Sequence, residues 1–169
     1  MNPMKQIKVE KLTLNFGSGK EQAKLERGMI LLKHITGKEP VKTITKKRIP
    51  AWGLRPGLPV GCKITLRGKE CMELIPRLLD AKKRKLEPSD FDDNGNVSFS
   101  VPEYIEIPDV QYEPKVGITG FNVCVTLTRP GFRIAKRRIR KAKVPRKHKI
   151  DKEEAMEFMK ESFQAQIGG

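Results

Sequence analysis

Two short segments rich in β-branched residues flank a long stretch rich in proline and glycine, and this arrangement constrains the fold more than any other part of the sequence. Residues 41–45 and 60–66 alternate in the period of a half-buried strand. The stretch between them is too long for a tight hairpin turn. The sequence therefore predicts two strands joined by a long loop, and Trp52, the single tryptophan, lies inside that loop.

Further strand patterns occur on both sides of this feature. Apolar and polar side chains alternate, or nearly alternate, in four other segments, namely residues 7–16, 97–101, 104–107 and 121–128. The last of these is the strongest, because every second residue from Phe121 to Leu127 is apolar. We expect all four segments to form strands.

Two helices are predicted in the first half of the chain. Ser18 and Glu21 have the spacing of a capping box, and the apolar residues that follow keep helical spacing until Gly37. Residues 69–85 carry a second apolar helical face, with Pro76 as an expected kink or break. Helices and strands are thus mixed along the chain, which indicates an α+β protein.

Charge is strongly segregated along the sequence, whose formal net charge is +15. Residues 43–68 contain no carboxylate but hold six cations, Lys46, Lys47, Arg48, Arg55, Lys63 and Arg67. Residues 87–113 show the reverse pattern, with acidic residues and no lysine or arginine. Phosphate is the natural counter-charge for the basic regions, and the aromatic face of Trp52 suits stacking on a base.

The basic block at residues 129–149 contains 11 lysines and arginines and no acid. Such a block repels itself when free, so it is a candidate arm that becomes ordered on an anion. Asp151 and Glu154 form a second capping signal, which predicts a short helix ending at Gly168. We expect one α+β RNA-binding domain in residues 1–128, followed by a basic arm and a C-terminal helix in residues 129–169.

Several classes of protein are disfavoured by composition. The three cysteines, Cys62, Cys71 and Cys124, are odd in number and widely spaced, which argues against a disulfide framework and a zinc site. The N-terminus has no apolar stretch of signal-peptide length, and no apolar run approaches the length of a membrane span. We therefore expect a soluble, cytoplasmic protein with no membrane partner.

Two motifs suggest ligand sites but match poorly. Residues 16–20, FGSGK, lie between a strand and a helix like a phosphate loop, yet Leu14 and Glu21 occupy positions where that motif needs glycine and a hydroxyl residue. The segment from Asp90 to Gly95 copies the first half of a calcium loop, but Val101 stands where a glutamate is needed. An ordinary turn and a hairpin are the favoured interpretations.

Nothing in the sequence indicates catalysis. His34 and His148 have no serine, cysteine or carboxylate placed by sequence to form a triad. We expect no enzyme activity, no catalytic residue, no metal and no cofactor. RNA is a better partner than DNA, because the basic segments resemble loops and strands rather than a recognition helix. A membrane-bound amphipathic helix fits the basic block badly, because the block has few large apolar residues and is interrupted by Pro130, Gly131 and Pro145.

Three motifs, in this order, resemble one family closely: VEKLTLNFG at residues 9–17, TGKEP at residues 36–40 and GLPVGCKITLRG at residues 57–68. The chain resembles the universal large-subunit ribosomal protein five family, which binds 5S ribosomal RNA. The resemblance extends over residues 7–128. The missing leading helix and the added basic arm are similar to the archaeal branch of that family.

This resemblance implies an antiparallel sheet with helices on one face, a protruding loop, and a basic C-terminal extension with a short helix. It implies 5S RNA contacts at Asn15, Lys38, Thr65 and Arg67. Within residues 47–56 it implies a loop that reaches transfer RNA in the P site of the ribosome, through Lys47, Arg48, Trp52 and Arg55.

The resemblance also implies partners beyond these two RNAs. The acidic middle of the chain suits a protein, and residues 109–120 are expected to touch a small-subunit ribosomal protein. We expect the arm to lie on large-subunit or 5S ribosomal RNA through Arg133, Lys136, Arg137, Arg138, Arg140 and Lys141. The alternative functions are a free RNA chaperone or an RNA-processing factor.

Overall fold

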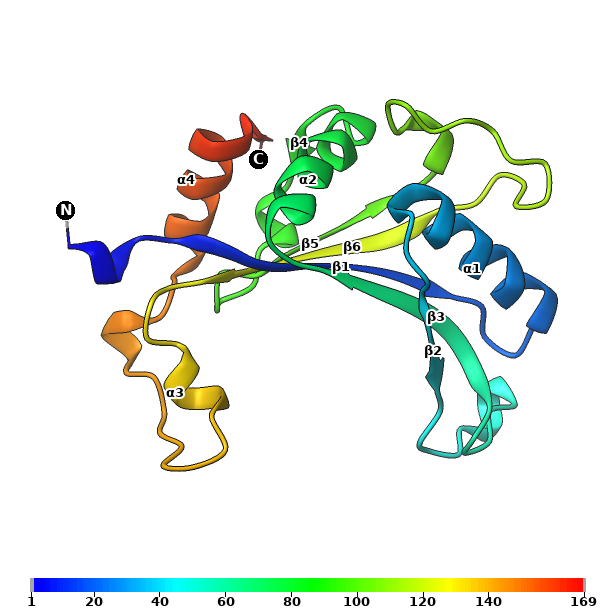
Figure 1. Cartoon of the computed structure of the whole chain (residues 1–169), viewed down its shortest axis with the longest axis horizontal. Coiled ribbons are helices and arrows are strands. Elements are labelled where there is room, and N and C mark those ends of the chain that lie inside the picture. The colour runs from blue at the N-terminus through cyan, green and yellow to red at the C-terminus, as the bar shows by residue number, and fades with distance from the viewer. Residues whose placement is uncertain (1, 169) are drawn as a thin grey trace. The chain divides into compact units, whose positions relative to one another are not determined.

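The computed structural model describes residues 2–168, and its main feature is a five-stranded sheet with the strand order β2-β3-β1-β6-β5 (Figure 1). The strands are β1 (Lys8–Gly17), β2 (Val41–Ile44), β3 (Pro59–Leu66), β5 (Val97–Val101) and β6 (Phe121–Thr128). Strand β2 pairs antiparallel with β3. The protein is of the α+β class, with an antiparallel sheet and helices, as predicted.

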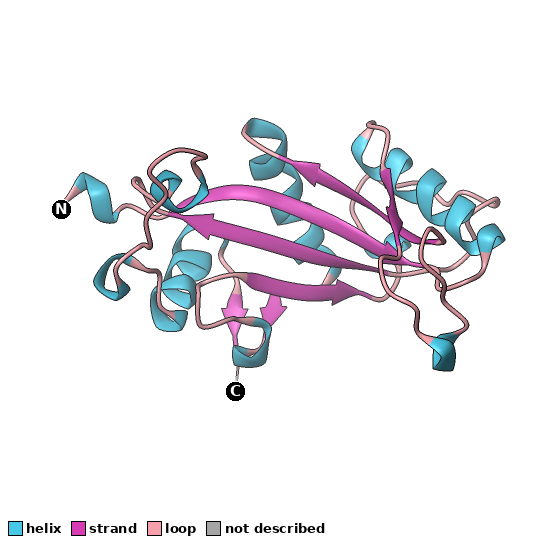
Figure 2. Ribbon diagram, turned by 90° about the horizontal axis from the view of Figure 1, so that it is seen from below, coloured by secondary structure: helices cyan, strands magenta, loops and turns pink. Residues whose placement is uncertain are grey.

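The helices and a second, smaller sheet complete the fold. The α-helices are α1 (Gln22–Thr36), α2 (Lys69–Ala81), α3 (Arg133–Lys136) and α4 (Lys152–Phe163). Single 3₁₀ turns occupy Pro3–Lys5, Pro50–Trp52, Pro88–Asp90, Tyr104–Glu106 and Arg146–His148. The short strands β4 (Lys85–Leu86) and β7 (Gln166–Ile167) pair in parallel near the C-terminus (Figure 2). None of the helices in residues 2–168 is long and apolar enough to cross a membrane.

The chain forms two compact units. The terminal unit comprises the segment up to Leu12, Arg67–Phe99, and the segment from Cys124 onward. The central unit comprises Thr13–Leu66 and Ser100–Val123. In the central unit α1 lies along one side of the strands, and the loop between β2 and β3 projects away from it (Figure 1). In the terminal unit α2 lies on one side of the strands and α3 on the other (Figure 1).

The sheet has one buried face and one open face, because burial alternates along its strands. On β1, Leu12, Leu14 and Phe16 are buried, whereas Asn15 between them is exposed. Strand β6 likewise buries every second side chain from Phe121 onward. The buried side chains form the core with the apolar faces of the helices, which leaves a polar sheet surface toward solvent.

The first helix ends as the sequence predicts but begins differently. Gly37 adopts the left-handed conformation, and its N–H donates to the Lys33 carbonyl. The expected capping box is wrong: the N-cap is Glu21, and it forms no side-chain hydrogen bond with the helix. The Ser18 hydroxyl is buried without a partner, because the backbone N–H of Ser18 donates to Val60 on β3 and holds the turn away from the helix start.

Two other sequence predictions need correction. Helix α2 continues through Pro76 but ends at Ala81, because Lys83 and Arg84 have positive φ angles and leave the helical path. The segment predicted as a strand at residues 104–107 instead forms a 3₁₀ turn over Tyr104–Glu106. Tyr104 is fully buried there, and its hydroxyl accepts a hydrogen bond from the Glu113 N–H at 3.0 Å. The buried residues Tyr104 and Ile107 are three positions apart, which is the period of a 3₁₀ turn and not of a strand.

The predicted capping box at the last helix is confirmed. The Asp151 side chain accepts from the backbone of Glu154, and the Glu154 side chain accepts from the Asp151 N–H. Helix α4 ends at Phe163 rather than Gly168, because Gln164 adopts the left-handed conformation and the chain then pairs with β4 as β7.

Candidate nucleic-acid interface

The open sheet face of the central unit carries two of the predicted 5S RNA contacts. Asn15 on β1 and Thr65 on β3 are both exposed, on neighbouring strands of the sheet. Lys63 is exposed two residues before Thr65 and pairs in register with Val41 on β2. Amide, hydroxyl and ammonium groups therefore share this surface, and no carboxylate interrupts the β2 and β3 parts of it.

The other two predicted 5S contacts lie at the ends of elements. Lys38 follows the left-handed Gly37 at the end of α1, and its N–H donates to the Thr36 hydroxyl at 3.3 Å. Arg67 is exposed directly after β3. The structure thus places Asn15 and Thr65 on the strands themselves, and Lys38 where a helix ends.

The loop between β2 and β3 is folded by its own hydrogen bonds. Ile49 and Leu54 exchange backbone hydrogen bonds of 3.0 and 3.1 Å, which close a small turn around the Pro50–Trp52 segment. At the base of the loop, the N–H and hydroxyl of Thr45 both donate to the Leu58 carbonyl. The loop is therefore a hairpin extension of the two strands.

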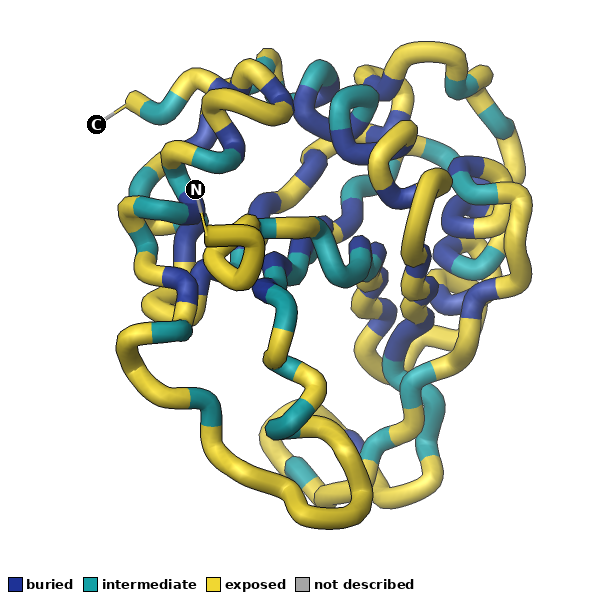
Figure 3. Tube along the Cα trace, turned by 60° about the vertical axis from the view of Figure 1, so that its left-hand side comes forward, coloured by how far each residue is buried: buried dark blue, intermediate teal, exposed yellow. Residues whose placement is uncertain are grey.

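The loop presents its charges to solvent. Lys47, Arg48 and Arg55 are exposed, and Trp52 is 68% exposed. Figure 3 shows long exposed stretches in the loops that connect the strands and helices. Trp52 does not pack into the loop, since Leu54 provides the buried side chain there. An exposed aromatic ring among cations that lack acidic neighbours in sequence is a suitable surface for a polyanion with stacking bases.

Lys20 is a basic residue beside this loop that was not predicted as an RNA contact. A Cβ atom built on Gly53 of the loop would lie 3.7 Å from the Lys20 side chain, so Lys20 reaches the loop from the turn after β1. The sequence signal is present in the FGSGK motif, whose match to a phosphate loop is poor. The structure also argues against a phosphate loop, because the N–H groups of Ser18 and Gly19 both donate to Val60 and are not free to hold phosphate.

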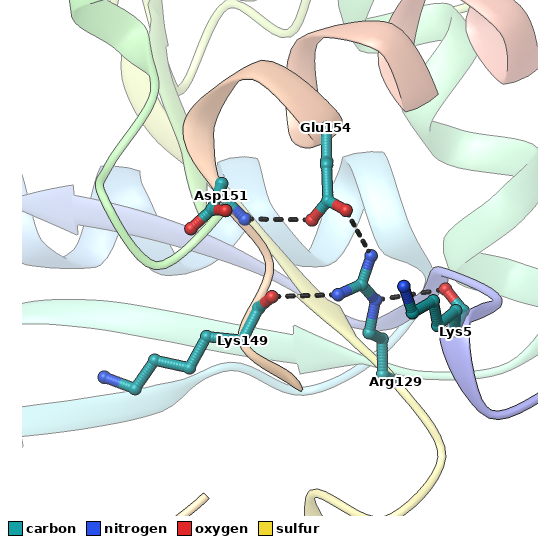
Figure 4. A network of polar contacts seen from close by, with 5 residues as sticks. All are labelled: Lys5, Arg129, Lys149, Asp151 and Glu154. Carbon is teal, nitrogen blue, oxygen red and sulfur yellow. Dashed lines mark hydrogen bonds and ion pairs between the residues drawn. The ribbon is translucent and has the colours of Figure 1, made fainter. Parts of the chain in front are cut away.

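The two ends of the basic arm are joined by one buried side chain. Arg129 is 5% exposed and makes three polar contacts (Figure 4). Its Nε donates to the Lys5 carbonyl at 3.0 Å, and one terminal nitrogen donates to the Lys149 carbonyl at 2.8 Å. The other terminal nitrogen pairs with Glu154 at 2.7 Å. We call this network the Arg129 clasp and residues 130–148 the arm.

The arm carries the other predicted RNA contacts on its surface. All six are exposed, namely Arg133, Lys136, Arg137, Arg138, Arg140 and Lys141. Two of them also have partners within the protein: Lys136 forms an ion pair with Glu10, and Arg137 donates to the Arg140 carbonyl at 2.7 Å. Arg129 itself is not part of this surface, although it belongs to the same basic block of the sequence.

The clasp makes stability depend on the ionisation of Glu154. Burial raises the pKa of Glu154, but hydrogen bonds from Arg129 and Asp151 outweigh burial and hold it below its ordinary value. A lowered native pKa contributes stability that is complete above the unfolded-state pKa and is lost as pH falls through the native one. We expect Glu154→Gln to unfold at lower urea concentration than the parent at neutral pH, with the difference disappearing in acid. A difference of the same size at both pH values would contradict this.

Two of the three thiols are buried, and the segment that resembles a calcium loop folds as a turn. Burial raises the pKa of Cys62 and Cys71 to about 11, so both remain protonated and unreactive. Asp92 and Gly95 form an ordinary turn, and Phe91 pairs with Val97 across it. Across residues 2–168, no three histidine, cysteine or acidic side chains gather as metal ligands would.

Comparison with known families explains this combination of an open sheet face, a basic loop and an arm. Residues 2–55 match the family described as Ribosomal protein L5, and residues 59–158 match the model for the C-terminus of the same ribosomal family. The chain belongs to the ribosomal protein L5 family. The assignment made from sequence motifs is confirmed, and the L5 family consists of structural ribosomal proteins rather than enzymes, as expected.

Curated L5 relatives match along nearly the whole chain. The protein from Sulfurisphaera tokodaii is 45% identical over 99% of this chain and 95% of its own length. Proteins from Methanobrevibacter smithii and Nanoarchaeum equitans are each 44% identical, over 96% and 98% of both chains respectively. All three are named large ribosomal subunit protein uL5. The similarity includes the arm, in keeping with an L5 protein of the archaeal type.

Proposed function

We propose that this L5 protein is a structural component of the large ribosomal subunit that binds 5S ribosomal RNA and contacts P-site transfer RNA. It acts in the cytoplasm, as part of the ribosome, by binding and without chemistry. The observation that carries the proposal is an L5-family sheet with one open polar face that continues into an exposed basic loop.

The 5S RNA surface consists of Asn15, Lys38, Thr65 and Arg67. Arg67 and Lys38 supply cations for phosphate groups, which fix the position of the protein on the RNA. Asn15 and Thr65 supply neutral donors and acceptors for base edges or 2′-hydroxyl groups. The sheet supports this role for Asn15 and Thr65, because neighbouring strands hold the two residues at a fixed spacing on the open face.

The transfer-RNA surface is the loop between β2 and β3. Lys47, Arg48 and Arg55 contact phosphates, and the exposed ring of Trp52 covers a base or a sugar. The backbone hydrogen bonds between Ile49 and Leu54 close the turn that carries Trp52.

Two further partners follow from the charge pattern. The cations of the arm lie on large-subunit ribosomal RNA. The segment at residues 109–120 binds a small-subunit ribosomal protein, and the exposed side chains of Tyr112 and Ile118 supply apolar contact area for it.

The test is titration of the full chain against 5S ribosomal RNA at several salt concentrations. We expect saturable, salt-sensitive binding. Arg67→Ala should weaken it about three- to tenfold and lower the slope of log affinity against log salt by about 1, since one phosphate contact is lost. The matched control is Lys160→Ala, which removes an exposed cation from α4, outside the proposed surfaces.

Equal affinity for unrelated RNA hairpins would contradict 5S-specific binding. Absence of the protein from purified large subunits would favour a free RNA chaperone or an RNA-processing factor instead.

A further inference from the structure

A cavity of about 380 Å³ lies where the arm leaves β6, within the terminal unit. We propose that this cavity receives one unstacked base of a single-stranded RNA segment, while the cations at its rim bind the flanking phosphates. The proposal rests on the RNA-binding function above and goes beyond it, because it assigns a base-binding site to the arm in addition to phosphate contacts.

The cavity wall is mainly apolar. Pro130 and the half-buried ring of Phe132 supply carbon surface, and Thr128 at the end of β6 lies beside them. The Phe132 ring is held in place by His148, whose ring meets it at 67° with the centroids 5.7 Å apart. A flat, fixed aromatic group next to a small apolar hollow matches the faces of a nucleobase.

The cavity is formed without a ligand, because the arm is closed on itself. The Arg129 clasp joins the two ends of the arm. Inside the arm, the Phe132 N–H donates to the Arg129 carbonyl at 3.2 Å, and the His148 ring hydrogen-bonds to the Pro130 carbonyl at 2.8 Å. A site that is already shaped loses little entropy when it is filled.

The rim of the cavity is charged in a way that favours a nucleotide over an apolar peptide. Arg133 is exposed, and its guanidinium has no hydrogen-bond or ion-pair partner among residues 2–168. Lys136 lies on the same rim and pairs with Glu10, which is the one carboxylate in the wall. Arg133 is therefore available to a phosphate, while Glu10 and the Thr128 hydroxyl can bond the polar edge of a base.

A second hollow of about 390 Å³ continues this surface along the arm. It shares Gly131 and Arg133 with the first and adds Ile134 and Arg137. Phosphates on both sides of an inserted base would thus meet cations. Duplex RNA cannot fill the cavity, because its bases are stacked and paired.

The experiment uses photo-cross-linking with the full chain. The probe is a short single-stranded RNA of mixed sequence that carries one 4-thiouridine, and the comparison is the same strand annealed to its complement. We expect cross-links at residues 128–133, located by mass spectrometry, with a yield about tenfold lower for the duplex, the size that loss of one stacked base implies.

Two variants of equal charge separate the cavity from general electrostatics. Arg133→Met should reduce the cross-link at the cavity about fivefold, whereas Lys160→Met, at an exposed position of α4 that does not line the cavity, should leave it nearly unchanged. Cross-links confined to the tip of the arm, or equal yields for single strand and duplex, would overturn the proposal while RNA binding itself persisted. Failure of both probes to bind would overturn the proposed RNA-binding function as well.

Discussion

Arg129→Met is expected to lower the free energy of unfolding by about 3 kcal/mol. The variant removes three polar contacts at once and leaves the carbonyls of Lys5 and Lys149 without their charged donor. It also leaves Glu154 without its cation. Urea-induced unfolding at neutral pH, followed by far-ultraviolet circular dichroism, measures this change.

Arg138→Met is the matched control for the Arg129 clasp. It makes the same chemical change in the same arm at an exposed position, and we expect a change of less than about 0.5 kcal/mol. If both variants proved equally stable, the clasp would not hold the arm.

Gly61→Ala is expected to lower the free energy of unfolding by about 2 kcal/mol. A Cβ at this position would lie 2.4 Å from the Phe16 carbonyl oxygen and 3.1 Å from the Thr43 hydroxyl. The first neighbour is backbone inside the sheet, so it cannot rotate away as a side chain can. Because Thr43 pairs with Gly61 in the β2–β3 register, we expect the variant also to loosen the basic loop that these strands carry.

Gly17→Ala provides the comparison for Gly61. Gly17 lies at the end of β1, and a Cβ there would meet no atom within 4 Å. We expect it to be neutral or slightly stabilising, since alanine restricts the unfolded chain more than glycine does. The melting temperatures of the two variants, measured by thermal unfolding, test this difference. If Gly61→Ala were as stable as Gly17→Ala, β1 and β3 could move apart without a loss of folding free energy.

Local patterns in the sequence predicted most of the fold, and their failures have identifiable causes. Strand β6 was predicted with its bounds correct, because alternation over Phe121–Thr128 is continuous. The capping signal at Asp151 was right, whereas the same signal at Ser18 was wrong. The difference is tertiary: the backbone of Ser18 bonds to Val60, a residue far along the chain.

In the candidate site, too, local features agreed with the sequence pattern, whereas contacts between distant residues could not be predicted. The exposure of Asn15 and Thr65 agrees with strand alternation, because each lies between buried apolar residues of its own strand, but only the family resemblance singled them out as RNA contacts. The clasp was not predictable, because Arg129 and its partner Lys5 are 124 residues apart. In sequence, Arg129 is one of many basic residues in its block. Only the folded structure distinguishes Arg129, which is buried and stabilises the fold, from the exposed cations of the arm, which are accessible to a ligand. Their contacts with particular RNAs remain predictions.

Closure of the arm has a consequence for the protein outside its complex. Because the Arg129 clasp ties both ends of the arm to the body of the terminal unit, the cations between them cannot move apart to relieve their mutual repulsion. Folding free energy must balance that repulsion in the unbound protein. Added salt screens it, and a bound polyanion neutralises it. The free energy of unfolding of the free protein should therefore rise with salt concentration. Its affinity for RNA should fall over the same range.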